Sequence, residues 1–130
     1  MLLLAVGGAT ALATKRDSRD VCKHFAKQVQ GFGMKPGEWG PIPKELRELP
    51  PGAKLCGSTG FVTVIASPIE GKALQDYYTP LMARAGCRNL SCQINSVQTD
   101  CNCQHTDRSG HSWPGRVLTD AGLEVYKLFY

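Results

Sequence analysis

Residues 87–105, CRNLSCQINSVQTDCNCQH, contain four of the six cysteines and decide the fold of this chain. Apolar and polar residues alternate over 90–94 and again over 101–105, which is the period of a half-buried strand. A short polar turn separates the two runs. The stretch therefore predicts two neighbouring strands that turn their cysteines toward a core.

Two of these cysteines are so close in sequence that they need separate partners. Cys101 and Cys103 point to the same face of one strand, and a bond between them would strain the backbone. The nearest candidates are Cys92, across the turn, and Cys87, which follows a predicted helix. Six cysteines allow 15 connectivities, and the sequence does not choose among them. The remaining one or two bonds are expected to involve Cys22 and Cys56.

An amphipathic helix of about five turns is predicted immediately upstream, over 68–85, from its apolar residues at helical spacing. Ser67 is suited to the N-cap, Pro68 to the first helical position, and Glu70 completes a capping box. Pro80 lacks a backbone donor and clashes with the preceding turn. It therefore predicts a kink, or a second short helix that begins beside it.

The flanking regions supply one more helix and several strands. A helix with a single apolar face begins at Ser18 and ends at Gly31. The second part of the strand region 54–66 is apolar on both faces, which indicates a central strand covered from both sides. Further strands are expected over 116–118 and 123–130, after a polar loop over 106–115.

The order of these elements predicts an α+β fold. We expect an antiparallel sheet of four to five strands, with two helices packed on one face and disulfides joining the layers. By analogy, the run over 54–105 resembles part of a split-βαβ, ferredoxin-like sandwich. A chain of 130 residues is long enough for one such core.

The N-terminus resembles a secretory leader. Residues 1–13 form an apolar run too short to span a bilayer, which takes about 20 residues, and they end in a small-x-small pattern at Ala13. No Lys or Arg precedes the run. Lys15 and Arg16 then form a dibasic pair of the kind cut in the eukaryotic secretory pathway. These features predict a signal peptide, a pro-segment over 14–16, and one disulfide-rich domain over 17–130.

Export places the cysteines in an oxidising compartment, where an even number indicates a disulfide framework. Each bond that closes a loop of tens of residues contributes about 3–4 kcal/mol in the chain-entropy treatment. Three such bonds rival the whole stability of a small domain. All six cysteines are therefore predicted to be structural: Cys22, Cys56, Cys87, Cys92, Cys101 and Cys103.

Two further features bear on partners. Asn89-Leu90-Ser91 is an acceptor triplet for N-glycosylation, which is usable only in the secretory pathway. The net charge of +4 comes from scattered basic residues, so there is no signature of nucleic-acid binding. No transmembrane segment is expected, and we expect a monomer.

A zinc site is the first alternative use of this cysteine cluster. Zinc takes four thiolate or imidazole ligands, and His105 joins four cysteines here. The spacing C-x4-C-x8-C-x-C lacks the paired C-x2-C knuckles of a strong zinc signal. We therefore predict no metal, no cofactor and no catalytic residue.

A small secreted hydrolase of the ribonuclease type is the second alternative. It would use His105 or His111 together with a carboxylate such as Asp120 or Glu124. Arg108 and Arg116 would then bind phosphate. This hypothesis requires both histidines and a carboxylate to line one cleft.

The leader ending at Ala13, the Lys15-Arg16 pair and six cysteines together resemble the small secreted cysteine-rich proteins of fungi, a class that includes effectors and killer toxins. The resemblance implies a non-enzymatic extracellular protein that binds another protein or a cell-surface target. In a bacterium the same features would imply the periplasm. A third hypothesis is a structural or wall-associated accessory domain.

Overall fold

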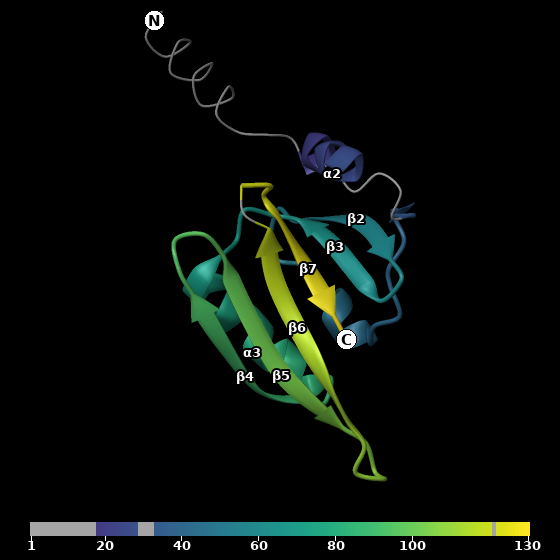
Figure 1. Ribbon diagram of the computed structural model, residues 1–130, viewed down its shortest axis with the longest axis vertical. Coiled ribbons are helices and arrows are strands. Elements are labelled where there is room, and N and C mark those ends of the chain that lie inside the picture. Colours follow the sequence, from purple (N-terminus) through teal and green to yellow (C-terminus); the bar gives the residue numbers. More distant parts are fainter. Residues whose placement is uncertain (1–17, 29–32, 121) are drawn as a thin grey trace, which may run out of the picture.

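A seven-stranded antiparallel sheet forms the centre of the computed structural model, which describes residues 18–28, 33–120 and 122–130 (Figure 1). The strands lie in the order β1-β2-β3-β7-β6-β5-β4. Within the described residues, two α-helices and one 3-10 turn accompany these strands. Their bounds are α2 Ser18–Gln28, β1 Lys35–Pro36, η1 Lys44–Arg47, β2 Lys54–Thr59, β3 Val62–Ala66, α3 Gly71–Arg84, β4 Cys87–Ile94, β5 Thr99–Thr106, β6 Ser112–Asp120 and β7 Val125–Phe129.

The expected sheet of four to five strands was wrong, because an unpredicted edge strand joins the predicted extended segments in one sheet. Lys35 and Pro36 form this short edge strand, β1. Residues 57–59 belong to β2, which has a bulge between Leu55 and Gly57, and the turn to β3 lies at Gly60 and Phe61. The predicted loop over 106–115 instead continues β5 and β6 around a tight turn. Pro114 is tolerated in β6 because β7 begins to pair with β6 only at Arg116.

The connectivity also differs from a split-βαβ unit. Strands β4 to β7 form a meander in which each pairs with the next in sequence. Strand β3 pairs with β7, so β7, β6 and β5 lie between the two strands that α3 connects. The ferredoxin-like topology that was predicted by analogy is therefore wrong.

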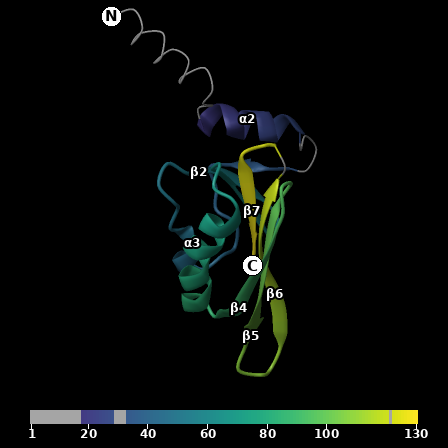
Figure 2. The ribbon, with the colours of Figure 1, turned by 90° about the vertical axis from the view of Figure 1, so that its left-hand side faces the viewer.

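The two helices pack on opposite faces of the sheet, and the prediction of one helical face was wrong. Ile65 in β3 belongs to the main core beneath α3. Its neighbours Val64 and Ala66 point the other way and contact Val21 and Phe25 of α2. Figure 2 shows α3 alongside the sheet and α2 across one end of it. The physical reason is the one the sequence indicated for β3, which is apolar on both faces and needs cover on both.

Helix α3 begins later than its capping pattern predicted. The Ser67 hydroxyl accepts a hydrogen bond from the Ile69 N–H at 3.2 Å, in a short turn ahead of the helix. The helix starts at Gly71, whose N–H donates to Thr99 Oγ1 at 2.6 Å. It then continues through Pro80 to Arg84 as one element, without the second helix that the proline predicted.

Tyrosines at the centre of the main core join α3 to the sheet. The hydroxyls of Tyr78 and Tyr126 are hydrogen-bonded to each other, and neither ring is exposed. The rings pack edge to face with centroids 5.5 Å apart. Leu74, Met82 and Leu128 are fully buried in the same cluster. Helix α3 is therefore held against the sheet mainly by apolar packing.

The predicted disulfide framework is present, with three bonds. Cys22–Cys56 joins α2 to β2 and spans 34 positions. Cys101 and Cys103 take different partners: Cys87–Cys103 spans 16 positions and Cys92–Cys101 spans nine. Both of these bonds join β4 to β5. Two of the three disulfide bonds therefore lie in one strand pair, and the third attaches α2 to β2.

Candidate functional site

The far end of the β5–β6 hairpin projects beyond the rest of the sheet (Figures 1 and 2). Pairing of β4 with β5 ends at Cys87 opposite His105, and pairing of β6 with β7 begins at Arg116 opposite Phe129. Past these points the hairpin has no neighbouring strand in the described part of the chain. We call residues 106–115 the finger.

Asp107 holds the tip of the finger in one conformation. Its Oδ1 accepts hydrogen bonds from the Ser109 N–H at 2.9 Å, the Ser109 hydroxyl at 2.6 Å and the His111 N–H at 3.0 Å. The Asp107 N–H donates to the His111 carbonyl, and the Gly110 N–H donates to the Asp107 carbonyl. The bond from the Ser109 hydroxyl is the main reason that the pKa of Asp107 lies below its ordinary value.

Aromatic rings line the base of the finger on the α3 side. The Trp113 ring stacks on His105, with centroids 5.2 Å apart and planes 15° apart. The Tyr130 ring packs edge-on against His105, with ring centroids 3.9 Å apart. The Tyr130 hydroxyl donates a hydrogen bond to the Ala85 carbonyl at 3.3 Å. The ring centroids of His111 and Trp113 lie 5.9 Å apart, and His111 is exposed. Trp113 and Tyr130 are both partly exposed, so the cluster continues the core to the surface.

His105 is the buried member of this cluster. The residue is 2% exposed, and its Nε2 has no hydrogen-bond partner among the described residues. Burial lowers the pKa of the imidazole, because the charged form would lose its water. His105 is therefore a neutral core residue at neutral pH.

The imidazole and the Cys87–Cys103 disulfide meet over Gly115. A Cβ at this position would lie 2.7 Å from Cys87 Sγ, 3.0 Å from Cys103 Sγ and 3.1 Å from His105 Nε2. All three distances are shorter than ordinary contacts. Glycine is required at position 115 because the sulfurs and the ring pack directly on the backbone.

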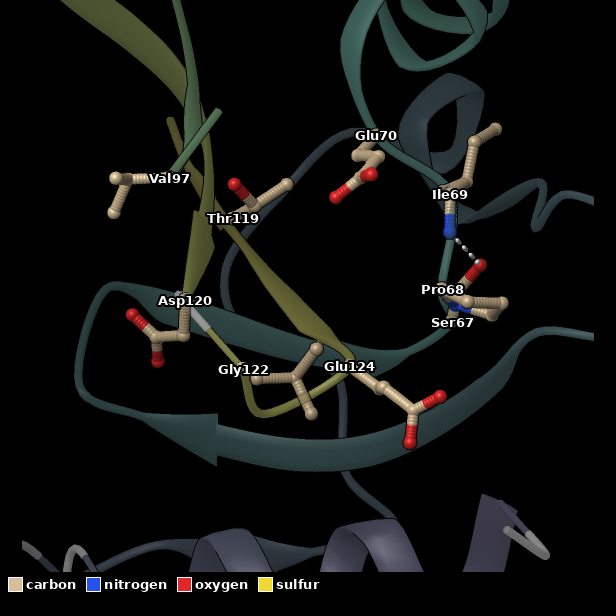
Figure 3. A pocket seen from close by; sticks show the side chains of 10 residues that line it. Ser67, Pro68, Ile69, Glu70, Val97, Thr119, Asp120, Gly122 and Glu124 are labelled. Atoms are coloured by element: carbon tan, nitrogen blue, oxygen red, sulfur yellow. Dashed lines mark hydrogen bonds between the residues drawn. The ribbon is translucent and has the colours of Figure 1, made fainter. Parts of the chain in front are cut away.

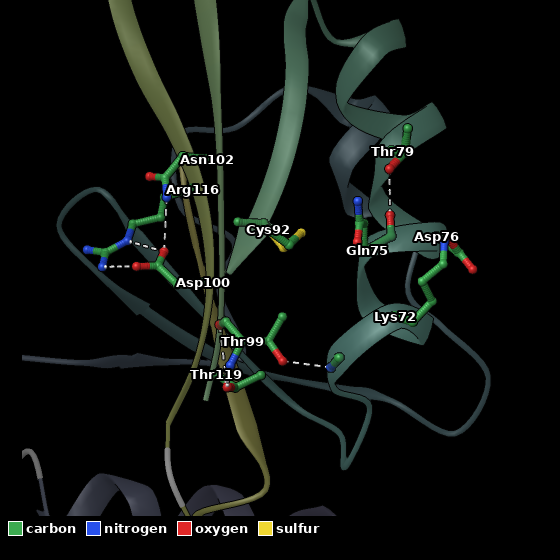
Figure 4. Close-up of a disulfide and its surroundings, with 12 residues drawn as sticks. Lys72, Gln75, Asp76, Thr79, Cys92, Thr99, Asp100, Asn102, Arg116 and Thr119 are labelled. Carbon is green, nitrogen blue, oxygen red and sulfur yellow. Dashed lines mark hydrogen bonds and ion pairs between the residues drawn. A yellow bond between two sulfur atoms is a disulfide. The ribbon is translucent and has the colours of Figure 1, made fainter. Parts of the chain in front are cut away.

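The opposite face of β4, β5 and β6 is polar, and no described helix covers it. Arg116 donates from Nε to Asp100 Oδ1 at 2.9 Å and from Nη2 to Oδ2 at 2.8 Å. These hydrogen bonds lower the pKa of Asp100. Figure 4 shows this pair and Asn102 on one side of the strands, with Cys92 on the side of α3. We call this the outer face.

A hollow of about 240 Å³ lies at the other end of β6, far from the finger along the strand. Glu70, Asp120 and Glu124 line it, and their carboxylates point in different directions (Figure 3). Asp120 is paired with Lys127 at 3.1 Å. The arrangement brings no two free carboxylates to one point.

Within the described residues, the histidines and carboxylates that the hydrolase hypothesis needs do not line one cleft. His105 is buried beneath Trp113, whereas His111 is exposed in the finger. Asp120 and Glu124 lie at the opposite end of β6 from the finger. None of the hollows described contains a histidine.

The zinc alternative lacks free ligands, because the four cysteines that it needs are bonded in pairs. Within residues 18–28, 33–120 and 122–130, no group of three or more His, Cys, Asp or Glu side chains is placed to hold a metal ion. The predicted processing positions Ala13, Lys15 and Arg16 lie outside the described residues. Asn89 is exposed on β4, and its glycosylation stays a prediction.

Sequence reasoning treated the finger as a polar loop and gave no role to Asp107 or Trp113. A usable signal was present in the turn residues Asp107, Ser109 and Gly110, between two runs that alternate. Pro114 and Gly115 obscured it, because both residues disfavour a central strand.

No family model matches this chain, and neither does any curated protein or solved structure that was compared with it. In the described part of the chain, no helix is both long and apolar enough to cross a membrane. Three disulfides are typical of a small protein of an oxidising compartment.

Proposed function

We propose that this protein is secreted and acts without catalysis, by binding another protein or a cell-surface target through its finger. Such a role corresponds to the effector-like and toxin-like members of the fungal class that the sequence resembles. The observation that carries the proposal is the preorganised, projecting tip of the β5–β6 hairpin.

The tip of the finger is held by hydrogen bonds within its turn and not by the core. Its tip residues 107–111 are exposed, so burial of apolar surface contributes little there. The tip is instead fixed by hydrogen bonds within the turn, three of them to Asp107. A loop that is ordered before binding loses less entropy when it binds, which favours affinity.

The composition of the finger fits a contact surface. Arg108 and His111 are exposed at the tip, and Trp113 is partly exposed at the base. Tryptophan and arginine are enriched among residues that dominate binding energy in protein interfaces. Arg108 favours a partner that presents carboxylates, phosphates or sulfates.

The two disulfides between β4 and β5 supply the fixed base that such a projection needs. They lie on the strand that carries one side of the finger. The stacked rings of His105 and Trp113 continue that support to the finger itself. A projecting hairpin without them would be only marginally stable.

Binding to whole cells tests the proposal. Fluorescently labelled protein with intact disulfides is titrated onto yeast cells and plant protoplasts and measured by flow cytometry. The double variant Arg108→Glu/His111→Ala is expected to weaken saturable binding at least about tenfold, which corresponds to about 1.4 kcal/mol. Lys54→Glu, a charge reversal at an exposed position on β2, serves as the control and is expected to bind normally.

Two outcomes contradict the proposal. One is saturable binding that the finger variant and Lys54→Glu change equally. The other is an absence of saturable binding to both cell types. RNA hydrolysis by the wild-type protein that His111→Ala abolishes would favour the hydrolase instead.

A further inference from the structure

The acceptor triplet Asn89-Leu90-Ser91 lies in a bulge of the edge strand β4. Arg88 pairs with Gln104 and Ser91 pairs with Asn102, so two residues of β4 stand opposite one of β5. Asn89 has φ of 60°, in the left-handed region that asparagine tolerates better than most residues. The bulge turns Leu90 toward the core and leaves Asn89 exposed.

A hollow adjoins the Asn89 side chain on the outer face. It comprises two adjoining spaces of about 510 and 220 Å³, which share Arg88, Asn89 and Gln104 as lining residues. Thr106 lines the larger space, and Asn102 and Pro114 line the smaller one. Amide, guanidinium and hydroxyl groups are the donors and acceptors that sugar hydroxyls require.

The two edges of the sheet differ in a way that makes this position important. The edge strand β1 has two residues and ends in a proline, so it offers little backbone for pairing. The edge strand β4 has eight residues. Its outward N–H and C=O groups have no partner strand among the described residues. An open edge of this length invites pairing with a second chain, and the bulge at Asn89 interrupts it only in part.

We propose that Asn89 carries an N-linked glycan that lies over this hollow and shields the β4 edge from pairing with a second copy of the chain. The proposal rests on the secretion part of the proposed function, because the modification takes place only in the secretory pathway. It does not depend on binding through the finger.

The chemistry of the step is a simple substitution. Asn89 Nδ2 forms a bond to the anomeric carbon of an oligosaccharide carried on a lipid pyrophosphate. The bond from that carbon to the pyrophosphate oxygen breaks, the lipid pyrophosphate leaves, and the amide loses one proton. No oxidant or reductant is required. Asn89 and Ser91 are both exposed in the folded chain.

The chain offers a clean test because it contains only one acceptor triplet. Asn95 and Asn102 are followed two positions later by Val97 and Gln104, which do not complete the pattern. The full chain is expressed in a eukaryotic secretory host, and the secreted protein is weighed before and after treatment with peptide:N-glycosidase in ¹⁸O-water. Loss of one glycan with conversion of Asn89 to ¹⁸O-labelled aspartate is expected.

Variants at Ser91 separate the modification from the fold. Ser91→Ala removes the acceptor without touching the left-handed Asn89 backbone and is expected to abolish the glycan. Ser91→Thr restores the acceptor in the same place and is expected to keep it. Secreted wild-type protein without a glycan at Asn89 would overturn the proposal.

Sedimentation tests the shielding role. The Ser91→Ala protein and the deglycosylated wild type are expected to form concentration-dependent dimers, whereas the glycosylated protein stays monomeric. If the unglycosylated proteins also stay monomeric at about 100 μM, shielding of the edge is contradicted. A dimer whose Kd is well above that concentration scarcely forms, so there would be no pairing for a glycan to prevent.

A foreign signal sequence ahead of the full chain keeps this test distinct from that of the proposed function. Glycosylated protein obtained only with the foreign leader supports the Asn89 site and contradicts natural secretion. Secretion with the chain's own leader but without a glycan contradicts the Asn89 proposal alone.

Discussion

Strand β3 is covered on both of its faces, whereas β5 has α3 on one face and an uncovered polar face on the other. In β3, Val64, Ile65 and Ala66 are all nearly fully buried, since Ile65 points into the main core and its two neighbours point toward α2. In β5 only alternate residues are buried, and two of these are disulfide-bonded cysteines. Around β3 the sheet is stabilised by apolar packing on both faces. Around β5 it is stabilised by apolar packing on one face and by two disulfide bonds.

The difference shows how a small protein can leave part of its sheet uncovered. Strand β4 is mostly exposed and polar, so apolar burial contributes little to its pairing with β5. The bonds Cys87–Cys103 and Cys92–Cys101 restrict the unfolded chain instead. This arrangement leaves the outer face and the finger free for contacts and for a glycan.

The largest expected effect comes from removing single disulfides in pairs of Cys→Ala substitutions. The chain-entropy treatment predicts losses of about 4 kcal/mol for Cys22–Cys56, about 3 for Cys87–Cys103 and about 2.5 for Cys92–Cys101, from their loop lengths. Urea titrations of the three double variants measure this order. If a β4–β5 bond proves the most costly to remove, packing of the sulfurs rather than loop length dominates.

Truncation of one leucine on each face compares the covered and uncovered sides directly. Leu128→Ala leaves a cavity beneath α3, where Leu128 is fully buried, and should cost about 3 kcal/mol. Leu118→Ala, at a partly exposed position of β6 on the outer face, should cost about 1 kcal/mol or less. Thermal unfolding of both variants checks the difference. Equal losses would mean that the outer face is buried by something that the structure does not describe.

Gly115→Ala tests the contact between the disulfide, the imidazole and the backbone. The added methyl would press on Cys87 Sγ, Cys103 Sγ and His105 Nε2, so we expect a loss of about 1–3 kcal/mol. The cost should fall when the same change is made in the Cys87→Ala/Cys103→Ala background, where the sulfurs are absent. A double-mutant cycle measured by urea unfolding gives this coupling. An unchanged cost in that background would place the strain elsewhere.

His105 should make stability depend on pH below about 7. Burial holds the pKa of folded His105 below its unfolded value of about 6.5, so protons bind the unfolded chain more readily. The free energy of unfolding therefore falls as pH falls through about 6.5, by at most about 1.4 kcal/mol per pH unit. His105→Phe should lose this slope, whereas Asp100, whose pKa is lowered, contributes its own loss only below about pH 4. A wild-type slope retained by His105→Phe would assign it to another group.

The features that were predicted correctly from the sequence depend on residues that lie close together in the chain. The alternation over 90–94 and 101–105 predicted two strands and inward cysteines, and both strands are present and longer than expected. The apolar run in β3 predicted cover on both faces. The disulfide framework followed from an even number of cysteines in a chain with a leader-like N-terminus.

The errors came from features that depend on distant residues. Ser67 and Glu70 make a good capping pattern, but the helix begins at Gly71, whose N–H is bound by Thr99 from a strand 28 positions away. Pro114 and Gly115 argue against a strand until it is known that β7 ends before reaching them. The sequence also placed both helices on one face, because hydrophobic period indicates which side of a helix is buried and not which side of the sheet it covers.

The sequence by itself thus determined the cysteine framework and the faces of individual strands, because these depend on residue type and on a period of two. Only the tertiary structure decided the seven-strand order, the opposite placement of α2 and α3 and the projection of the finger. Those features depend on which distant segments pair, and pairing is set by the shape and burial of whole surfaces. The candidate contact surface and the open β4 edge belong to this second group.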